Sequence, residues 1–295
     1  MRLVYLGTPG ASVAPLRALC AAGHDVALVI TQPDRKRGRG SALVPSPVKR
    51  AATDLGLPVS HDLRDSLNVG ASLGVVVAYG ALVPADVLSA LPMLNLHFSS
   101  LPRWRGAAPV ERAILAGDAT TGVCVMGLEV TLDTGPVFAR REVDIEGRYA
   151  DELTICLSDL GAELLTDTLS SPSLPPAVPQ VGDATYAKKL SADDFLLAPT
   201  ETADMLHRRV RLDRAFTWVN GRRLRVLRAH STHDATAPGR VASSNGVVTL
   251  GAADGSLVLE LVQSEGGRAV DADAWWSGAR LATGVEWGPV DVSHP

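Results

Sequence analysis

The first half of the chain alternates short apolar segments with segments of helical periodicity, and this alternation restricts the fold more than any other feature. Strands rich in β-branched and aliphatic residues are predicted at 2–6, 26–31, 74–79 and 94–98. Helices that begin near proline or end before glycine or proline are predicted at 12–22, 47–55 and 84–90. Strands that alternate with helices form βαβ units, so the pattern predicts an α/β domain around a parallel sheet.

The remainder of the chain divides into a continuation of this domain and a second, smaller one. A helix at 108–116, a strand pair at 121–130 and 136–145, and a helix at 150–169 complete the first domain. The proline-rich stretch 170–184 is predicted to be an extended surface connector. Short strands at 222–229, 239–241, 246–250 and 256–262 lie between glycine or asparagine turns without crossover helices, which favours a small β-barrel, with an OB-like fold as one possibility. We place the domains at 1–188 and 203–295, with a linker at 189–202.

Composition narrows the class of protein. A hydrophobic content of 46% and a net charge of 28 − 32 = −4 indicate a folded chain that is not a polyanion binder as a whole. Three scattered cysteines predict neither a disulfide framework nor a zinc site, and fit a reduced, cytoplasmic setting without a metal. The longest uncharged run, 66–85, contains Asn68 and Pro84, so we expect a buried strand there and no membrane span.

A glycine turn follows the first predicted strand, at a position where doubly wound folds often bind phosphates. Its sequence is Gly7-Thr8-Pro9-Gly10. The G-x-G-x-x-G spacing is missing, so a dinucleotide site is weakly supported and a tight turn that leads into a helix explains the motif as well.

Asn95 and His97 stand two apart at the end of a predicted strand, so their side chains share one face. Ligands of open parallel sheets bind beyond the carboxyl ends of the strands, where both residues are expected. An amide that donates hydrogen bonds and an imidazole that titrates near pH 6.5 suit oxyanion stabilisation with proton transfer. A histidine at a strand end can also be purely structural, but the polar partner and the following loop of Ser, Pro, Arg, Trp and Gly favour catalysis.

Asp133 is the third candidate catalytic residue. It precedes Thr134-Gly135-Pro136, where an aspartate is commonly a turn former that accepts bonds from local backbone amides. If the fold brings it beside His97, its carboxylate can instead orient the imidazole and stabilise its charge, or accept a proton from an amine nucleophile.

Three sequence blocks together resemble the methionyl-tRNA formyltransferases, a branch of the formyltetrahydrofolate-dependent formyltransferases. The blocks are Asn95 to Pro109, Thr121 to Gly135, and Thr31 to Lys49 with its Gln32-Pro33-Asp34-Arg35 and Pro45-Ser46-Pro47 motifs. The likeness runs in order over most of residues 1–190, and the blocks at 101–109 and around Thr31 are specific to the tRNA-directed branch.

The resemblance implies a Rossmann-like formyltransferase domain joined to an OB-like β-barrel domain that binds tRNA. It implies that 10-formyltetrahydrofolate donates a formyl group to the α-amino group of methionyl-initiator tRNA, without a metal or a covalent acyl-enzyme. In that reaction Asn95 and His97 would polarise the formyl group, and Asp133 would hold the protonation state of His97 and assist loss of the amine proton. Folate would contact Ser99, Ser100, Leu101 and Pro102, with the pterin near the end of the 75–79 strand.

Two basic segments are candidates for RNA contact. The stretch 34–40 holds four cations and two glycines, with Arg35, Lys36, Arg37 and Arg39 as its basic residues. Alone it also fits a solvated surface loop, but in the resembling family the corresponding loop inserts at the acceptor stem. Between 208 and 228 stand eight arginines and one aspartate, and among them Arg208, Arg223 and Arg225 are taken as tRNA contacts.

Other functions remain open on sequence grounds. A formyltransferase that acts on a small amine, such as an amino sugar or a purine precursor, would share Asn95, His97 and Asp133 but would not need the two basic segments. A non-catalytic RNA-binding protein would not need the three candidate catalytic residues. A nicotinamide-dependent dehydrogenase is disfavoured by the missing glycine fingerprint. We expect the chain to act as a monomer, because catalysis and RNA binding are encoded together.

Overall fold

The computed structural model describes residues 1–36, 43–171, 173–282 and 284–289. It divides into two compact units. The first comprises Met1–Val110, Ala119–Glu146 and Glu152–Lys188, and the second comprises Glu111–Asp118, Gly147–Asp151 and the chain from Lys189 onward. The main boundary therefore falls between Lys188 and Lys189, while two short segments that precede it in sequence belong to the second unit.

The first unit is built on a seven-stranded sheet with the order β10-β9-β7-β6-β1-β2-β5. Its strands are β1 (Arg2–Gly7), β2 (Asp25–Ile30), β5 (Val59–Ser60), β6 (Leu73–Val77), β7 (Met93–His97), β9 (Thr120–Gly127) and β10 (Val137–Asp144). The strands from β7 to β5 run parallel, whereas β9 and β10 are antiparallel additions at the β7 side. β6 and β7 are buried along their whole length, as expected for inner strands covered on both faces.

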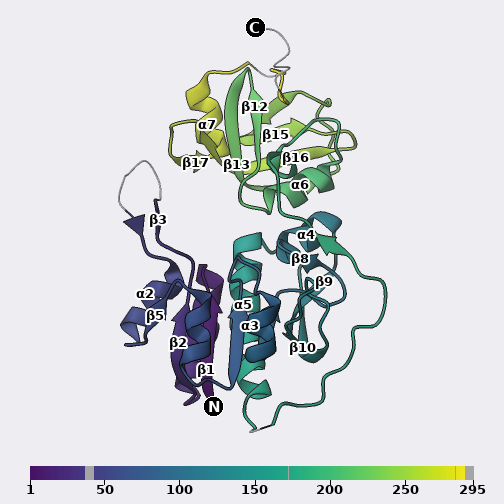
Figure 1. Cartoon of the computed structure of the whole chain (residues 1–295). Helices are drawn as coiled ribbons and strands as arrows, with labels where there is room; N and C mark the ends of the chain where they lie inside the picture. The colour runs from purple at the N-terminus through teal and green to yellow at the C-terminus, as the bar shows by residue number, and fades with distance from the viewer. Residues whose placement is uncertain (37–42, 172, 283, 290–295) are drawn as a thin grey trace. The chain divides into compact units, whose positions relative to one another are not determined.

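Helices cover both faces of this sheet. They are α1 (Val13–Ala21), α2 (Pro47–Asp54), α3 (Ala85–Ala90) and α5 (Ala150–Thr168) (Figure 1). The helix α4 (Pro109–Ala116) lies mostly within the second unit. Val87 of α3 packs with Val4, Leu6 and Ile30 on one face. On the other face α5 approaches β7 so closely that a Cβ on Gly161 would lie 2.8 Å from Leu96 Cδ2. The parallel α/β sheet predicted for this domain is thus observed.

Local signals set the ends of these helices. The hydroxyl of Ser46 accepts a hydrogen bond from the amide of Lys49 at 2.9 Å, and Pro47 occupies the first turn of α2. Gly23, which follows the C-cap residue Ala22 of α1, adopts a φ of +79°, the left-handed conformation that glycine tolerates best. The helix boundaries predicted from proline and glycine therefore lie within two residues of those observed.

The second unit is a curled antiparallel sheet with the order β12-β13-β16-β15-β14, and β17 pairs with β16. Its strands are β12 (Phe216–Val219), β13 (Arg222–Thr232), β14 (Val241–Ser244), β15 (Val247–Gly251), β16 (Ser256–Ser264) and β17 (Ala269–Asp271). Two hairpins turn on Asn220-Gly221 and Asn245-Gly246, with both residues of each pair at positive φ, as two-residue turns that match strand twist require.

A short terminal segment connects the two edges of this sheet. Trp287 forms a bridge with Val219 of β12, and Glu286 forms a bridge with Arg240 just before β14. These two bridges bring the edge strands into one continuous wall, which agrees with the expected barrel-like, OB-like architecture. Two helices of this unit, α6 (Ala203–Val210) and α7 (Ala272–Ala279), were not predicted from the sequence, and neither was β12.

The segment expected to be a linker, 189–202, contains structure of its own. It holds the 3₁₀ helix η3 (Ala192–Phe195), and Leu196 bridges to Phe216 of β12. Thr202 caps α6 by accepting a hydrogen bond from the amide of Met205. Within the second unit these residues therefore form part of the fold.

Candidate functional site

Asn95 and His97 lie on β7, the strand at the junction between the parallel and antiparallel parts of the sheet. Leu94 and Leu96 alternate with them and are almost fully buried. The alternation places Asn95 and His97 together on one face of the strand, as predicted. Both side chains are also buried, with exposed fractions of 9% and 6%, so they act in an environment with little bulk water.

Asp133 joins this pair from the loop between β9 and β10. Its carboxylate accepts a hydrogen bond from the backbone N–H of Gly106 at 2.8 Å and a longer one from Asn95 Nδ2 at 3.4 Å. Its Oδ2 atom lies 3.8 Å from Nδ1 of His97. The fold therefore gathers the three candidate residues, which are up to 38 positions apart in sequence, around one buried point.

The backbone of Asp133 is in the left-handed region, with a φ of +52°. Aspartate and asparagine adopt this conformation more readily than other residues with a Cβ atom. The turn-forming interpretation and the catalytic interpretation of Asp133 are thus compatible, because the turn is what directs the carboxylate toward His97.

The proton on His97 can be assigned from its partners. Nε2 lies 2.9 Å from the carbonyl oxygen of Trp104, and a carbonyl oxygen only accepts, so Nε2 carries a hydrogen. Nδ1 is consequently the ring atom available to take up or release a proton, and it faces Asp133. The loop after β7 therefore fixes the ring, with Trp104 itself at a φ of +63°.

This arrangement combines two chemical abilities. The amide of Asn95 can donate a hydrogen bond to an oxygen that gains negative charge. Nδ1 of His97 can exchange a proton, and the carboxylate of Asp133 stabilises the positive charge that the imidazole then carries. Together they suit attack of an amine on a carbonyl-type carbon, in which charge develops on oxygen and a proton leaves nitrogen.

The four residues proposed to contact folate differ in what they can offer. Ser99 is buried, and its hydroxyl donates to the carbonyl of Trp104 at 3.4 Å. Leu101 is fully buried against Cys124, Met126 and Val137, so it can offer a ligand only its backbone. Ser100 and Pro102 are partly exposed. Folate contact at these positions stays a prediction.

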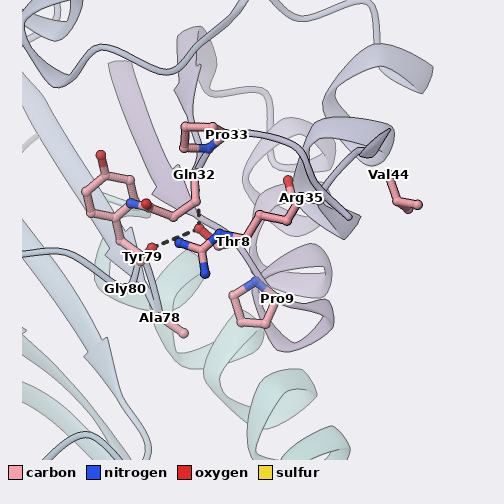
Figure 2. Close-up of a pocket in the computed structure, with 10 residues that line it drawn as sticks. Thr8, Pro9, Gln32, Pro33, Arg35, Val44, Ala78, Tyr79 and Gly80 are labelled. Carbon is pink, nitrogen blue, oxygen red and sulfur yellow. Dashed lines mark hydrogen bonds between the residues drawn. The ribbon is translucent and has the colours of Figure 1, made fainter. Parts of the chain in front are cut away.

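A cavity of about 270 Å³ opens at the carboxyl ends of β1, β2 and β6 (Figure 2). Thr8 joins the three strand ends, because its hydroxyl donates to the carbonyl of Tyr79 at 2.8 Å and accepts from the amide of Gln32 at 3.3 Å. The lining residues are Thr8, Pro9, Gln32, Pro33, Arg35, Val44, Ser46, Ala78, Tyr79 and Gly80. The glycine turn after β1 therefore contributes to a cavity, although it lacks the dinucleotide fingerprint.

Tyr79 is largely buried in the wall of this cavity. Burial raises the pKa of its phenol, and the negative charge of Asp62 raises it further. The hydroxyl consequently remains protonated at neutral pH and can donate a hydrogen bond to a ligand.

The first basic segment is described only in part. Arg35 and Lys36 form the exposed strand β3 (Arg35–Lys36), which pairs with β4 (Leu43–Val44). Arg37 and Arg39, also predicted to bind tRNA, lie outside the described residues. The guanidinium of Arg35 lines the cavity of Figure 2, which connects this segment with the strand ends.

Arginines of the second unit have different surroundings: some form ion pairs or hydrogen bonds within the fold, and others face outward. Arg209, Arg211 and Arg228 stabilise the fold through Glu201, the carbonyl of Arg148, and Asp213 respectively. The outward-facing group includes Arg223 and Arg225, which flank the buried Leu224 on β13 and so share one face, as predicted. The guanidinium of Arg223 stacks 4.1 Å from the ring centroid of Phe216. Arg208 lies against Gly117 and is partly buried.

Among the residues that the structure describes, no group of three or more His, Cys, Asp or Glu side chains is arranged to hold a metal ion. In the same residues no helix has the length and apolar character needed to cross a membrane.

Several groups at the site gave no signal in the sequence. Two are backbone groups, the carbonyl of Trp104 and the N–H of Gly106, and their roles depend on loop conformation. A third is Gln180, which lies in the proline-rich connector yet donates to the carbonyls of Asp133 and Gly135. A pattern of spacing cannot reveal such contacts because the partners are far apart along the chain.

Comparison with known proteins agrees with this fold. Residues 1–169 match the formyl transferase family model, and residues 189–280 match the model of the formyl transferase C-terminal domain. The two matches in this order define the class of protein as a two-domain formyl transferase.

Full-length relatives narrow the class to one family. The methionyl-tRNA formyltransferase of Rhizorhabdus wittichii is 40% identical over 306 residues, which cover 97% of this chain and 98% of that protein. The methionyl-tRNA formyltransferase of Clavibacter sepedonicus is 42% identical over 296 residues, covering 94% and 97%. The chain belongs to the methionyl-tRNA formyltransferase family.

A solved structure shares the architecture at low sequence identity. A sugar 3N-formyl transferase, crystallised in the presence of dTDP and 5-N-formyl-THF, superposes with a TM-score of 0.67 at 14% identity, covering 90% of this chain and 97% of that one. At this identity the likeness concerns the fold alone.

Proposed function

We propose that the chain transfers the formyl group of 10-formyltetrahydrofolate to the α-amino group of methionyl-initiator tRNA, producing formylmethionyl-tRNA for translation initiation. The observation that carries this proposal is the buried convergence of Asn95, His97 and Asp133 in a chain of this family. The donor set fits a formyl group, because an amide N–H and an imidazole share one face of β7.

10-Formyltetrahydrofolate supplies an activated formyl carbon, and the amino nitrogen of the acceptor supplies the electron pair that forms the new C–N bond. Asn95 Nδ2 donates to the formyl oxygen as that oxygen gains negative charge. His97 accepts a proton at Nδ1, since Nε2 is held by the carbonyl of Trp104. The carboxylate of Asp133, 3.8 Å away, stabilises the resulting imidazolium. The proton lost by the amine balances the proton that the departing folate nitrogen gains.

Positions for the two substrates follow from the surroundings of the site. The loop at Ser99, Ser100, Leu101 and Pro102 would contact folate. The pterin would lie near the end of the 75–79 strand, where the cavity at Thr8, Gln32 and Tyr79 opens, and Arg35 of the basic segment lines the same cavity. The tRNA-contacting residues would be Arg35, Lys36, Arg37, Arg39, Arg208, Arg223 and Arg225.

The division of labour would follow the two domains. Residues 1–188 would perform catalysis, and residues 203–295 would bind tRNA, with the exposed Arg223 and Arg225 of β13 in support. We further propose that the protein acts as a monomer in the cytoplasm, where charged tRNA and folate are both present. Light scattering of the purified protein tests the monomer directly, and a stable dimer at working concentration would contradict it.

The direct test is product analysis. The purified protein is incubated with 10-formyltetrahydrofolate and charged initiator tRNA, and the amino acid released from the tRNA is identified by mass spectrometry. Formylmethionine is expected, and it should be absent when either the protein or the folate is omitted. Unmodified methionine here, together with formylation of an amino sugar or a purine precursor in a parallel incubation with that amine, would refute the assignment.

A further inference from the structure

The segment 178–187, here called the strap, crosses both loops that carry the catalytic site of the first unit. Val178 pairs through its backbone with Val137, directly after the Asp133 loop. At the other end, β11 (Tyr186–Ala187) pairs with β8 (Arg105–Gly106) in the loop that follows β7. The sequence predicted only an extended connector here, but the strap joins two segments that are otherwise distant along the chain.

Gln180 stands in the middle of the strap and bonds to both loops at once. Its Nε2 donates to the carbonyl oxygens of Asp133 and Gly135, each at 2.8 Å. Its Oε1 accepts from Nε and an Nη of Arg105, at 3.0 and 2.7 Å. Both amide hydrogens and the amide oxygen are therefore engaged, so only a glutamine-like side chain can satisfy all of these partners.

These bonds close a ring around Asp133. Gln180 holds the backbone of Asp133 and the side chain of Arg105, and the neighbouring Gly106 donates its N–H to the Asp133 carboxylate at 2.8 Å. The left-handed backbone at Asp133, with a φ of +52°, is the conformation that directs this carboxylate toward His97. Such a conformation is unfavourable for a residue with a Cβ atom and persists when surrounding contacts hold it.

We propose that Gln180 is a positioning residue that sets the orientation of the Asp133 carboxylate toward His97. The inference rests on the proposed formyl transfer, and it assigns the strap a part in that reaction. Gln180 itself need not touch either substrate, because its effect passes through Asp133.

The first test compares turnover of three proteins. Gln180→Met keeps the length of the side chain and removes its hydrogen bonds, and we expect kcat for formyl transfer to fall about 10- to 100-fold, as displacement of a catalytic group does. The KM for folate and for methionyl-tRNA should remain within about threefold, since substrate contacts are unchanged. Val181→Thr is the matched control, because Val181 is the next residue and 82% exposed. Equal kcat in Gln180→Met and wild type would overturn the inference.

Two further variants separate positioning from general stability. Gln180→Glu can still accept from Arg105 but cannot donate to the carbonyls of Asp133 and Gly135, so its kcat should fall as in Gln180→Met. Wild-type turnover in Gln180→Glu would refute a role for these donated bonds. The double variant Asp133→Asn, Gln180→Met should have a kcat within about threefold of that of Asp133→Asn alone, because the effect of Gln180 requires the carboxylate. A full additional loss would show that Gln180 acts by another route.

A measurement without turnover keeps this inference separable from the proposed function. Hydrogen–deuterium exchange of the segment 129–136 should quicken about tenfold or more in Gln180→Met, since two bonds to this turn are lost. Unchanged exchange would contradict the inference even if the enzyme is active. Faster exchange in Gln180→Met, together with a wild-type protein that fails to formylate tRNA, would support the hold of Gln180 on this turn and refute the proposed function.

Discussion

Replacing Asp133 by asparagine removes one negative charge from the site with little change in shape. Asparagine tolerates the left-handed backbone found here, with its φ of +52°. Its amide oxygen can take the place of Oδ2 and accept from the N–H of Gly106, as the carboxylate does at 2.8 Å. The substitution therefore removes the charge of Asp133 and, in place of Oδ1, sets an N–H group that cannot accept the 3.4 Å bond from Asn95. Alanine would also remove the contact with Gly106 that shapes the loop.

The size of the effect follows from one distance. A unit charge on His97 and the carboxylate of Asp133, 3.8 Å apart, attract each other by about 4 kcal/mol at an effective dielectric constant of about 20. Both side chains are buried, so screening by solvent is small. If His97 gains between half and all of a positive charge in the transition state, kcat should fall about 30- to 1,000-fold. KM should change little, because the substitution acts on charge that develops in the transition state.

The assay is single-turnover formylation of methionyl-tRNA with wild type, Asp133→Asn and the control Asp144→Asn, whose carboxylate is exposed at the end of β10. Thermal unfolding of the three proteins checks that the fold is retained. A kcat for Asp133→Asn within about threefold of wild type, with the fold intact, would refute the electrostatic role assigned to Asp133.

Three other outcomes follow from the structure. Arg223→Gln should reduce the slope of log affinity for tRNA against log salt by about 0.9 if this exposed side chain contacts one phosphate, and an unchanged slope would exclude that contact. Gly161→Ala should destabilise the fold by about 1–3 kcal/mol in urea unfolding, because its Cβ would meet the buried Leu96. Its control Gly278→Ala should stabilise the fold by about 0.5–1 kcal/mol, because no atom lies within 4 Å of the added Cβ and alanine favours the helix. Burial and the charge of Arg211 lower the pKa of His207. The unfolded chain therefore takes up this proton first, and the free energy of unfolding falls as pH drops below about 6.5. Between pH 7.5 and 5, His207→Gln should become more stable relative to wild type. An equal pH dependence of the two proteins would contradict the last expectation.

The sequence was informative where a local rule decides the structure. Short, largely apolar segments predicted β6 and β7, and Pro47 and Gly23 marked helix ends because their backbone preferences act locally. The shared face of Asn95 and His97 followed from the period of a strand. Each of these inferences requires only the neighbours of a residue in sequence.

The features of the fold and the site that the sequence did not predict depend on contacts that only the folded chain provides. The approach of Asp133 to His97 requires β9 to add antiparallel to β7, which spacing alone does not determine. The barrel closure by Trp287 and the contacts of Gln180 likewise join segments far apart in sequence. Local charge was equally ambiguous, since Arg228 belongs to the predicted basic cluster but pairs with Asp213 within the fold.

The most direct test of the account is the rate of formylmethionyl-tRNA formation by wild type and His97→Asn, with both substrates saturating. The account predicts rapid formylation by wild type and a loss of at least about 100-fold in the variant, as removal of a general acid–base group causes. Binding of both substrates should be retained. Equal rates for the two proteins would contradict the claim that proton transfer at His97, beside Asn95 and Asp133, drives the reaction.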